Sequence, residues 1–167
     1  GPGGLYFTVG DGGSADDHVF SLHTMPSGDL LVCGRTLSAP FAAIPYPVTA
    51  NAYQPGHNGG PNGSDCHVTI LDGACANVRY ATYLGGTGDE WIECGGVDAA
   101  GVATFHGASS SMDFPVTGTA CQPTSAGGTN ATLWGSYEGI VLRLDPGRPP
   151  AQQLLYAEGR HAVLVVL

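Results

Sequence analysis

The sequence predicts an all-β protein made of repeated four-stranded antiparallel units, and three observations carry this prediction. The acidic, glycine-rich stretch GGTGDE at 85–90 has a counterpart, GGSADD, at 12–17. A repeat at this long spacing indicates stacked structural units rather than one irregular domain. The chain also contains 27 Gly and 12 Pro in 167 residues, which favours short strands joined by turns over long helices. Finally, short apolar segments follow one another in the same order in both copies.

The composition excludes several classes of function. Only 11% of the residues are charged, all five basic residues are Arg, and the net charge is -9. Nucleic-acid binding is not expected, because it requires a basic surface. No apolar run is long enough to cross a membrane. The sequence contains no signal peptide, so we expect that any such peptide was removed or lies upstream. An acidic, Lys-free, Gly-rich chain suits a secreted or cell-envelope protein.

The first copy predicts a strand order that begins in the middle of a unit. Residues 1–4, Gly-Pro-Gly-Gly, are expected to be a flexible lead, and 5–9 form a strand that completes a preceding unit. Four strands then follow, with a tight turn after the first and a long irregular segment before the third. Their expected bounds are 18–25, 30–36, 66–71 and 78–84.

The second copy repeats this order, and the tail at 161–167 resembles the start of a third copy. Its strands are expected at 91–97, 102–108, 139–144 and 153–157. Connections this short favour an antiparallel meander. Four-stranded meanders in tandem are typical of the blades of a β-propeller, which needs roughly 4–8 of them. We therefore predict two blades, 5–79 and 80–156, with a third beginning in 157–167, as part of a larger propeller.

Specific motifs in the second copy resemble a known family. The run YATYLGGTGDE, then VDAAG, SSSMDFPVTGTACQP, EGIVLRLDP and LLYA, within 80–156, resembles the bacterial β-propeller repeat called the SBBP repeat. The resemblance is weaker across 5–79, where the insertion FAAIPYP interrupts the DFP triplet and MPSG replaces VDAAG. It implies a propeller in a large surface or secreted bacterial protein, and it implies no catalytic residues.

Acidic side chains gather in the glycine-rich loops. In a meander of this order, these loops and both long loops lie at the same end of the blades, where binding usually resides. One hypothesis is a Ca²⁺ site, since carboxylates on Gly-rich loops suit this ion. A second is catalysis by paired carboxylates. A third is that the carboxylates accept hydrogen bonds from nearby backbone amides and shape the turns. The candidate metal ligands are Asp16, Asp17, Asp89 and Glu90.

Aromatic and histidine side chains supply the candidate ligand face. His18 and Trp91 are equivalent positions on the innermost strands, where a cluster could hold a metal or a sugar. Tyr53 and Trp134 lie in the long loops, where exposed rings could stack on sugars or pin the loops to the sheet. The alternative for the histidines is ordinary packing or solvation.

The five Cys form no CxxC pair, so a zinc or redox site is not expected. Cys66 and Cys75 flank a strand and lie too far apart for a disulfide. A disulfide between Cys33 and Cys94 is expected if neighbouring sheets stack, and buried free thiols are the alternative.

The sequence favours a non-catalytic scaffold or protein-interaction module whose partners are other blades or subunits. One alternative is a lectin-like propeller that binds glycans through the long-loop face. Another is an enzyme that acts on polysaccharide, although no GxSxG, HExxH or phosphate-loop motif is present.

Overall fold

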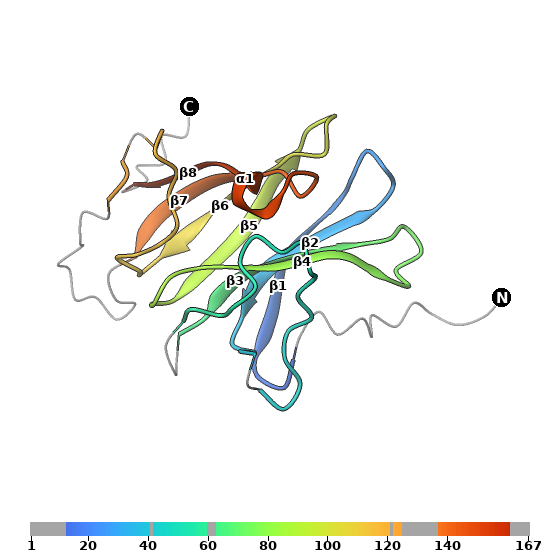
Figure 1. The fold of residues 1–167 in the computed structure, drawn as a ribbon, viewed down its shortest axis with the longest axis horizontal. Helices are drawn as coiled ribbons and strands as arrows, with labels where there is room; N and C mark the ends of the chain where they lie inside the picture. Colours follow the sequence, from blue (N-terminus) through green and yellow to red (C-terminus); the bar gives the residue numbers. More distant parts are fainter. Residues whose placement is uncertain (1–12, 41, 60–62, 121, 125–136, 161–167) are drawn as a thin grey trace.

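The computed structural model describes residues 13–40, 42–59, 63–120, 122–124 and 137–160, without the side chains of 156–160. It contains two four-stranded antiparallel sheets, each with its strands in sequence order (Figure 1). Sheet 1 consists of β1 (Asp17–Thr24), β2 (Leu30–Thr36), β3 (Asp65–Leu71) and β4 (Val78–Leu84). Sheet 2 consists of β5 (Glu90–Val97), β6 (Ala103–Ser109), β7 (Glu138–Leu144) and β8 (Leu154–Arg160). A single helical turn, α1 (Pro150–Gln153), precedes β8.

The sequence prediction of an all-β fold with two four-stranded antiparallel units is confirmed, and the bounds of β2 and β4 match at both ends. One local prediction was wrong, because Gln153 belongs to α1 rather than to a strand. Pro150 at the first helical position explains this turn, since its fixed φ suits a helix start. The predicted lead at 1–4 and the predicted strands at 5–9 and 161–167 lie outside the described residues.

The two sheets share the turn that follows their first strand, and both first strands are irregular in register, at positions two residues apart in the repeat. Gly28 and Gly101 occupy equivalent positions, with φ of 85° and 84°, in the turns that follow β1 and β5, a region that favours glycine. Each first strand carries an irregularity in register, between Val19 and Ser21 in β1 and between Cys94 and Gly96 in β5. The sequence repeat is therefore also a repeat of turn conformation.

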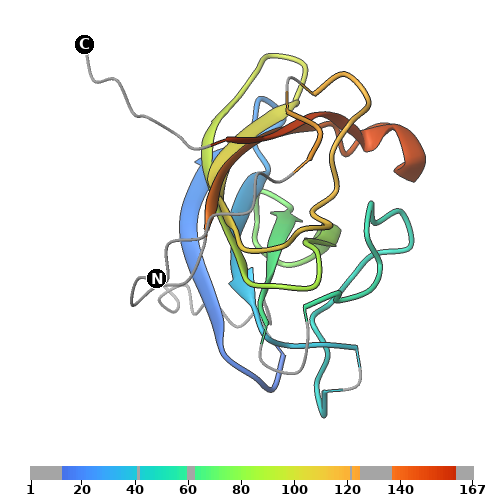
Figure 2. The same ribbon diagram turned by 90° about the vertical axis from the view of Figure 1, so that its left-hand side faces the viewer.

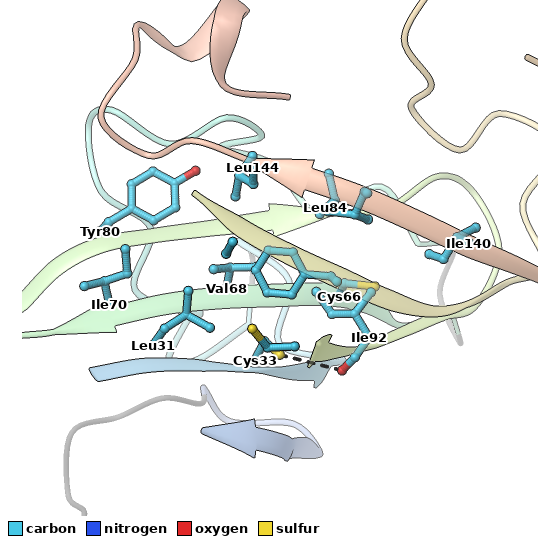
Figure 3. Close-up of a cluster of buried hydrophobic side chains, with 14 of the residues drawn as sticks. Leu31, Cys33, Cys66, Val68, Ile70, Tyr80, Leu84, Ile92, Ile140 and Leu144 are labelled. Atoms are coloured by element: carbon cyan, nitrogen blue, oxygen red, sulfur yellow. Dashed lines mark hydrogen bonds between the residues drawn. The ribbon is translucent and has the colours of Figure 1, made fainter. Parts of the chain in front are cut away.

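The hydrophobic core lies between the sheets (Figure 3). Leu31, Val68 and Ile70 of sheet 1 belong to the same buried cluster as Phe105 and Leu142 of sheet 2. At roughly 25 cal/mol per Å² of buried apolar surface, this layer is the main contribution that holds the sheets together.

The edge of β5 rests on the face of sheet 1. Ser21 Oγ accepts a hydrogen bond from the amide of Cys94 at 2.6 Å. His23 Nε2 donates to the carbonyl of Cys94 at 2.9 Å, and the thiol of Cys33 contacts the carbonyl of Ile92 at 3.8 Å. These side chains satisfy the backbone groups that an edge strand leaves unpaired.

The long loop between β2 and β3 runs back along the outer edge of β4. The amide of Thr49 donates to the carbonyl of Ala81 at 3.0 Å, and the amide of Tyr83 donates to the carbonyl of Gln54 at 3.1 Å. Figure 2 shows this loop, in teal, beside β3 and β4, with sheet 2 above. The sequence analysis placed the long loop at one end of the unit, whereas the loop also covers an edge of the sheet.

Candidate functional site

A single carboxylate closes the first glycine-rich loop, which precedes β1. Asp17 accepts hydrogen bonds from the amide of Gly13 at 2.7 Å and from the hydroxyl of Ser38 at 2.9 Å. It also accepts a hydrogen bond from the hydroxyl of Thr36, at the end of β2. The aspartate therefore ties its own loop to the neighbouring strand.

The same arrangement recurs at the start of sheet 2. Glu90 accepts hydrogen bonds from the amide of Gly86 at 3.0 Å and from the hydroxyl of Ser109 at 2.8 Å. It also accepts one from the hydroxyl of Ser111. Each of these donors is the counterpart of a donor to Asp17. The two sheets thus begin with one repeated side-chain network, built from an acid at the start of the first strand and hydroxyls at the end of the second.

The other two candidate metal ligands are also engaged at this end, each in a different way. The carboxylate of Asp89 accepts from the amide of Ser64 at 2.9 Å and from its hydroxyl at 3.2 Å. Asp16 is exposed, and its carbonyl accepts from the amide of Leu37 at 3.0 Å. Across the described part of the chain, no three His, Cys, Asp or Glu side chains come together as metal ligands. The geometry is what the turn-shaping hypothesis predicted, and the calcium hypothesis stays untested.

Two buried carboxylates meet where the sheets join. Asp65, at the start of β3, accepts from Gln54 Nε2 at 2.8 Å and from the amides of Asn58 at 2.9 Å and Gly59 at 2.8 Å. A methyl group at Gly85 would lie 2.7 Å from the Asp65 carboxylate and 2.5 Å from that of Glu90. A side chain at position 85 would have to displace one of the two carboxylates.

Burial raises the pKa of both carboxyl groups. For Glu90 the desolvation is opposed by hydrogen bonds from Ser111 and Ser109, and the charge of Asp65 adds to the increase in pKa. For Asp65 the desolvation is opposed by hydrogen bonds from its loop and by the charge of His57. Desolvation disfavours the charged form of each acid. The raised pKa values allow this pair to hold a proton. The groups around it, however, are the amides and side chains that fix the surrounding loops.

The candidate ligand residues on the first strand of each sheet come together through a residue that the sequence analysis did not single out. The ring of His18 stacks on Phe20 at a centroid distance of 6.1 Å, and Phe20 meets Trp91 edge-on at 6.2 Å. Phe20 is 43% exposed. His18, Phe20 and Trp91 form what we call the aromatic row. The expectation that positions 18 and 91 approach one another is consistent with this geometry.

The loop aromatics have a structural role where they are described. Tyr53 is partly buried and packs against the core, and this burial raises the pKa of its hydroxyl. Tyr46 is buried against β3 and β4. Both therefore pin the long loop to the sheet, as one of the two interpretations predicted. Trp134 lies outside the described residues.

The expected disulfide between Cys33 and Cys94 was wrong. Cys33, Cys66, Cys75 and Cys94 are all free thiols, and Cys121 lies outside the described residues. The thiol of Cys33 lies 3.0 Å from the hydroxyl of Ser21, while that of Cys94 points to the carbonyl of Gly96 at 3.6 Å. Burial raises the pKa of Cys33 to about 12, so this thiol is unreactive near neutral pH.

A hollow of about 540 Å³ lies at the opposite end of the sheets, among the short turns. Its principal charged residues are already paired, since Arg79 Nε lies 3.2 Å from Asp29 and Arg148 Nε lies 2.9 Å from Asp145. Ile70 and Tyr80 contribute apolar lining. A hollow at this end could not be expected from the sequence, because these turns carry no distinctive motif.

No family model matches the sequence, and no curated protein matches it. Within the described residues, no helix is long and apolar enough to span a membrane. The fold and the site define the class of the protein: it is a repeated all-β protein in which a carboxylate accepts hydrogen bonds from the loop before each sheet.

Proposed function

We propose that this chain is a non-catalytic scaffold made of propeller-type blades, of the SBBP-repeat kind, in a secreted or cell-surface bacterial protein. The observation that carries the proposal is the relation between the two sheets. One face of sheet 1 is buried between the sheets, and it carries Leu31, Cys33, Val68 and Ile70. These residues form the cross-strand pairs 31–70 and 33–68. Their counterparts in the second copy lie on the outer face of sheet 2 as the pairs 104–143 and 106–141.

That outer face is the surface onto which a further blade would stack. Val141 is 45% exposed there, whereas its counterpart Val68 is fully buried beneath sheet 2. This outer face of sheet 2 is more polar than the equivalent face of sheet 1, because Thr104, His106 and Arg143 replace apolar or thiol side chains. A partner for this face needs polar complements as well as apolar surface.

Equivalent residues of the two units also touch one another. The amide of Cys94 donates to Ser21 at 2.6 Å, and the hydroxyl of Tyr80 donates to Gln153 at 2.8 Å; both pairs join equivalent positions of the repeat. The two units meet through different faces, because the face of sheet 1 that is buried between the sheets corresponds to the outer face of sheet 2. Contacts of this kind can continue from unit to unit. This supports a propeller-type stack over a closed two-sheet sandwich.

The test uses the native polypeptide that contains this sequence. Val141→Asp should lower its melting temperature clearly, because a blade that covers Val141 would bury the new charge. Ile44→Asp, at a position that is 63% exposed in the described structure, is the matched control. Equal, small effects of the two substitutions would rule out a blade on this face.

A second candidate function, glycan binding, is favoured by the aromatic row. Partly exposed rings can stack on sugar faces, and His18 and Phe20 lie nearly parallel here. A glycan array with the wild-type protein and Trp91→Ala tests this: binding that the substitution removes supports it, and the absence of binding at high protein concentration rejects it.

A further inference from the structure

The first unit carries an arginine that the second unit lacks. Arg35 of β2 corresponds to Ala108 of β6 in the repeat. Arg35 is the register partner of His18 in sheet 1, just as Ala108 is the partner of Trp91 in sheet 2. Side chains at directly opposed positions leave the same face of a sheet, with their Cβ atoms roughly 4.5–5.5 Å apart. Arg35 therefore adds a positive charge at the His18 end of the aromatic row.

Among the arginines whose side chains are described, Arg35 has no acidic partner, whereas the other three do. The Nε atoms of Arg35 and Arg143 are both buried without a hydrogen-bond partner in the described structure, but an aspartate holds the guanidinium of Arg143. An unpaired charged donor costs stability, so an external anion gains most at Arg35. The three pairs, with N–O distances of 3.2, 2.7 and 2.9 Å, are Arg79–Asp29, Arg143–Asp98 and Arg148–Asp145.

The acidic side chains near Arg35 are committed to other donors. Burial raises the pKa of Tyr137; the charges of Asp89 and Glu90 add to this increase, and the charge of Arg35 opposes it. These groups therefore lie within electrostatic reach of one another. Asp89 already accepts hydrogen bonds from Ser64, and Glu90 accepts them from its own loop and from two serines. Neither carboxylate forms an ion pair with Arg35 in the described part of the chain.

The aromatic row and Arg35 combine two kinds of contact for a ligand. His18 is exposed, Trp91 and Arg35 are half-buried, and Phe20 is 43% exposed. Rings of this kind stack on sugar faces, and a guanidinium matches a carboxylate through two parallel N–H···O bonds. The net charge of -9 opposes an anionic ligand at long range. Salt screens that repulsion beyond about 8 Å at physiological ionic strength, so contact with Arg35 decides the binding.

We propose that the aromatic row and Arg35 form a binding site for an acidic glycan, in which sugar rings stack on the row and the carboxylate of a uronic acid pairs with Arg35. This inference rests on the second candidate function, glycan binding, and it names the class of ligand.

The test is a glycan array read with the native polypeptide that contains this sequence. The array carries oligouronates, such as oligogalacturonate and oligomannuronate, each beside its methyl ester, together with neutral glycans. Esterification removes the negative charge and leaves the sugar faces that stack on the rings. We expect an oligouronate to bind at least about tenfold more tightly than its ester, because a charge-assisted hydrogen bond contributes on this scale.

Four variants locate the contacts. Arg35→Gln should abolish the preference for the acid, and Trp91→Ala should weaken the binding of acid and ester alike. Arg79→Gln removes an arginine from the ion pair at the opposite end of sheet 1; it is the matched control and should bind as the wild type does. Circular dichroism checks each fold. If Arg35→Gln does not fold, Arg35→Lys decides, and it should reduce the preference because it keeps the charge without the planar fork.

The outcomes separate the inference from the function on which it rests. Equal binding of acid and ester by the wild type overturns the acidic class, and so does a preference that is unchanged in the Arg35 variant. If neutral glycans bind, Trp91→Ala removes that binding and no oligouronate is preferred, glycan binding stands and the acidic class fails. If no glycan binds at high protein concentration, both fail.

Discussion

Gly107 of β6 is a position where a single added methyl group should have a large effect on stability. A methyl group there would lie 2.0 Å from the carbonyl oxygen of Trp91 on β5. Its counterpart Gly34 faces the carbonyl of His18 in the same way, at 1.8 Å. The obstacle is backbone rather than a flexible side chain, so β5 has to move. We expect Gly107→Ala to cost about 3 kcal/mol, the upper end of the usual range for overpacking.

For a chain of this size, about 3 kcal/mol corresponds to a fall in melting temperature of roughly 6–12 °C. Urea denaturation and a thermal melt give the two numbers. Gly96→Ala is the matched control, because nothing lies within 4 Å of a methyl group at that position in the neighbouring strand. It should be neutral, since reduced freedom of the unfolded chain offsets small losses. Equal stability of the two variants would refute the close approach of β5 and β6 on which this reasoning rests.

Three further predictions concern the carboxylate loops. Burial raises the pKa of Glu90 above its ordinary 4.5, so folding favours the protonated form of this side chain. The contribution of Glu90 to the free energy of unfolding should therefore increase as the pH falls from neutral toward 4.5, and it should be lost as the pH rises again. As the pH is lowered over this range, the melting temperature of Glu90→Gln should rise less steeply than that of the wild type. An identical dependence of melting temperature on pH would contradict a raised pKa at Glu90. Ser111→Ala should lower the free energy of unfolding in urea by about 1–3 kcal/mol, because a donor to a buried carboxylate is lost; a loss near zero would mean that this hydrogen bond is not formed. Millimolar Ca²⁺ should leave the melting temperature unchanged, because the carboxylates of Asp17 and Glu90 already accept internal hydrogen bonds; a rise that a chelator reverses would establish a calcium site.

The strands could be predicted because each has a clear local signal. Apolar segments bounded by Gly, Pro and Asp recur with the same spacing, so both copies support each bound. Helix α1 was missed because one turn between a Pro-Pro pair and an apolar strand has no periodicity of its own. The path of the long loop along β4 was missed because backbone hydrogen bonds to a sheet edge leave no mark on side-chain pattern.

The candidate site could be predicted only in part. The repeated acids at 17 and 90 were found from the sequence, but their hydroxyl partners were not. A signal for them exists, because residues 36 and 38, like 109 and 111, place hydroxyl side chains at the same spacing after each second strand. The disulfide prediction failed because stacking of the sheets fixes where Cys33 and Cys94 lie but not where their thiols point. Phe20 was overlooked because no motif marks it as the ring that lies between His18 and Trp91.

The central claim is that the outer face of sheet 2 receives a further sheet of the same build. The most direct measurement is a cryo-electron microscopy or crystal structure of the native polypeptide that carries this sequence. The account predicts a third four-stranded sheet packed over Thr104, His106 and Val141, with the face of sheet 1 beneath Tyr46 still covered by its own loop. A native structure in which Val141 remains exposed to solvent would contradict it.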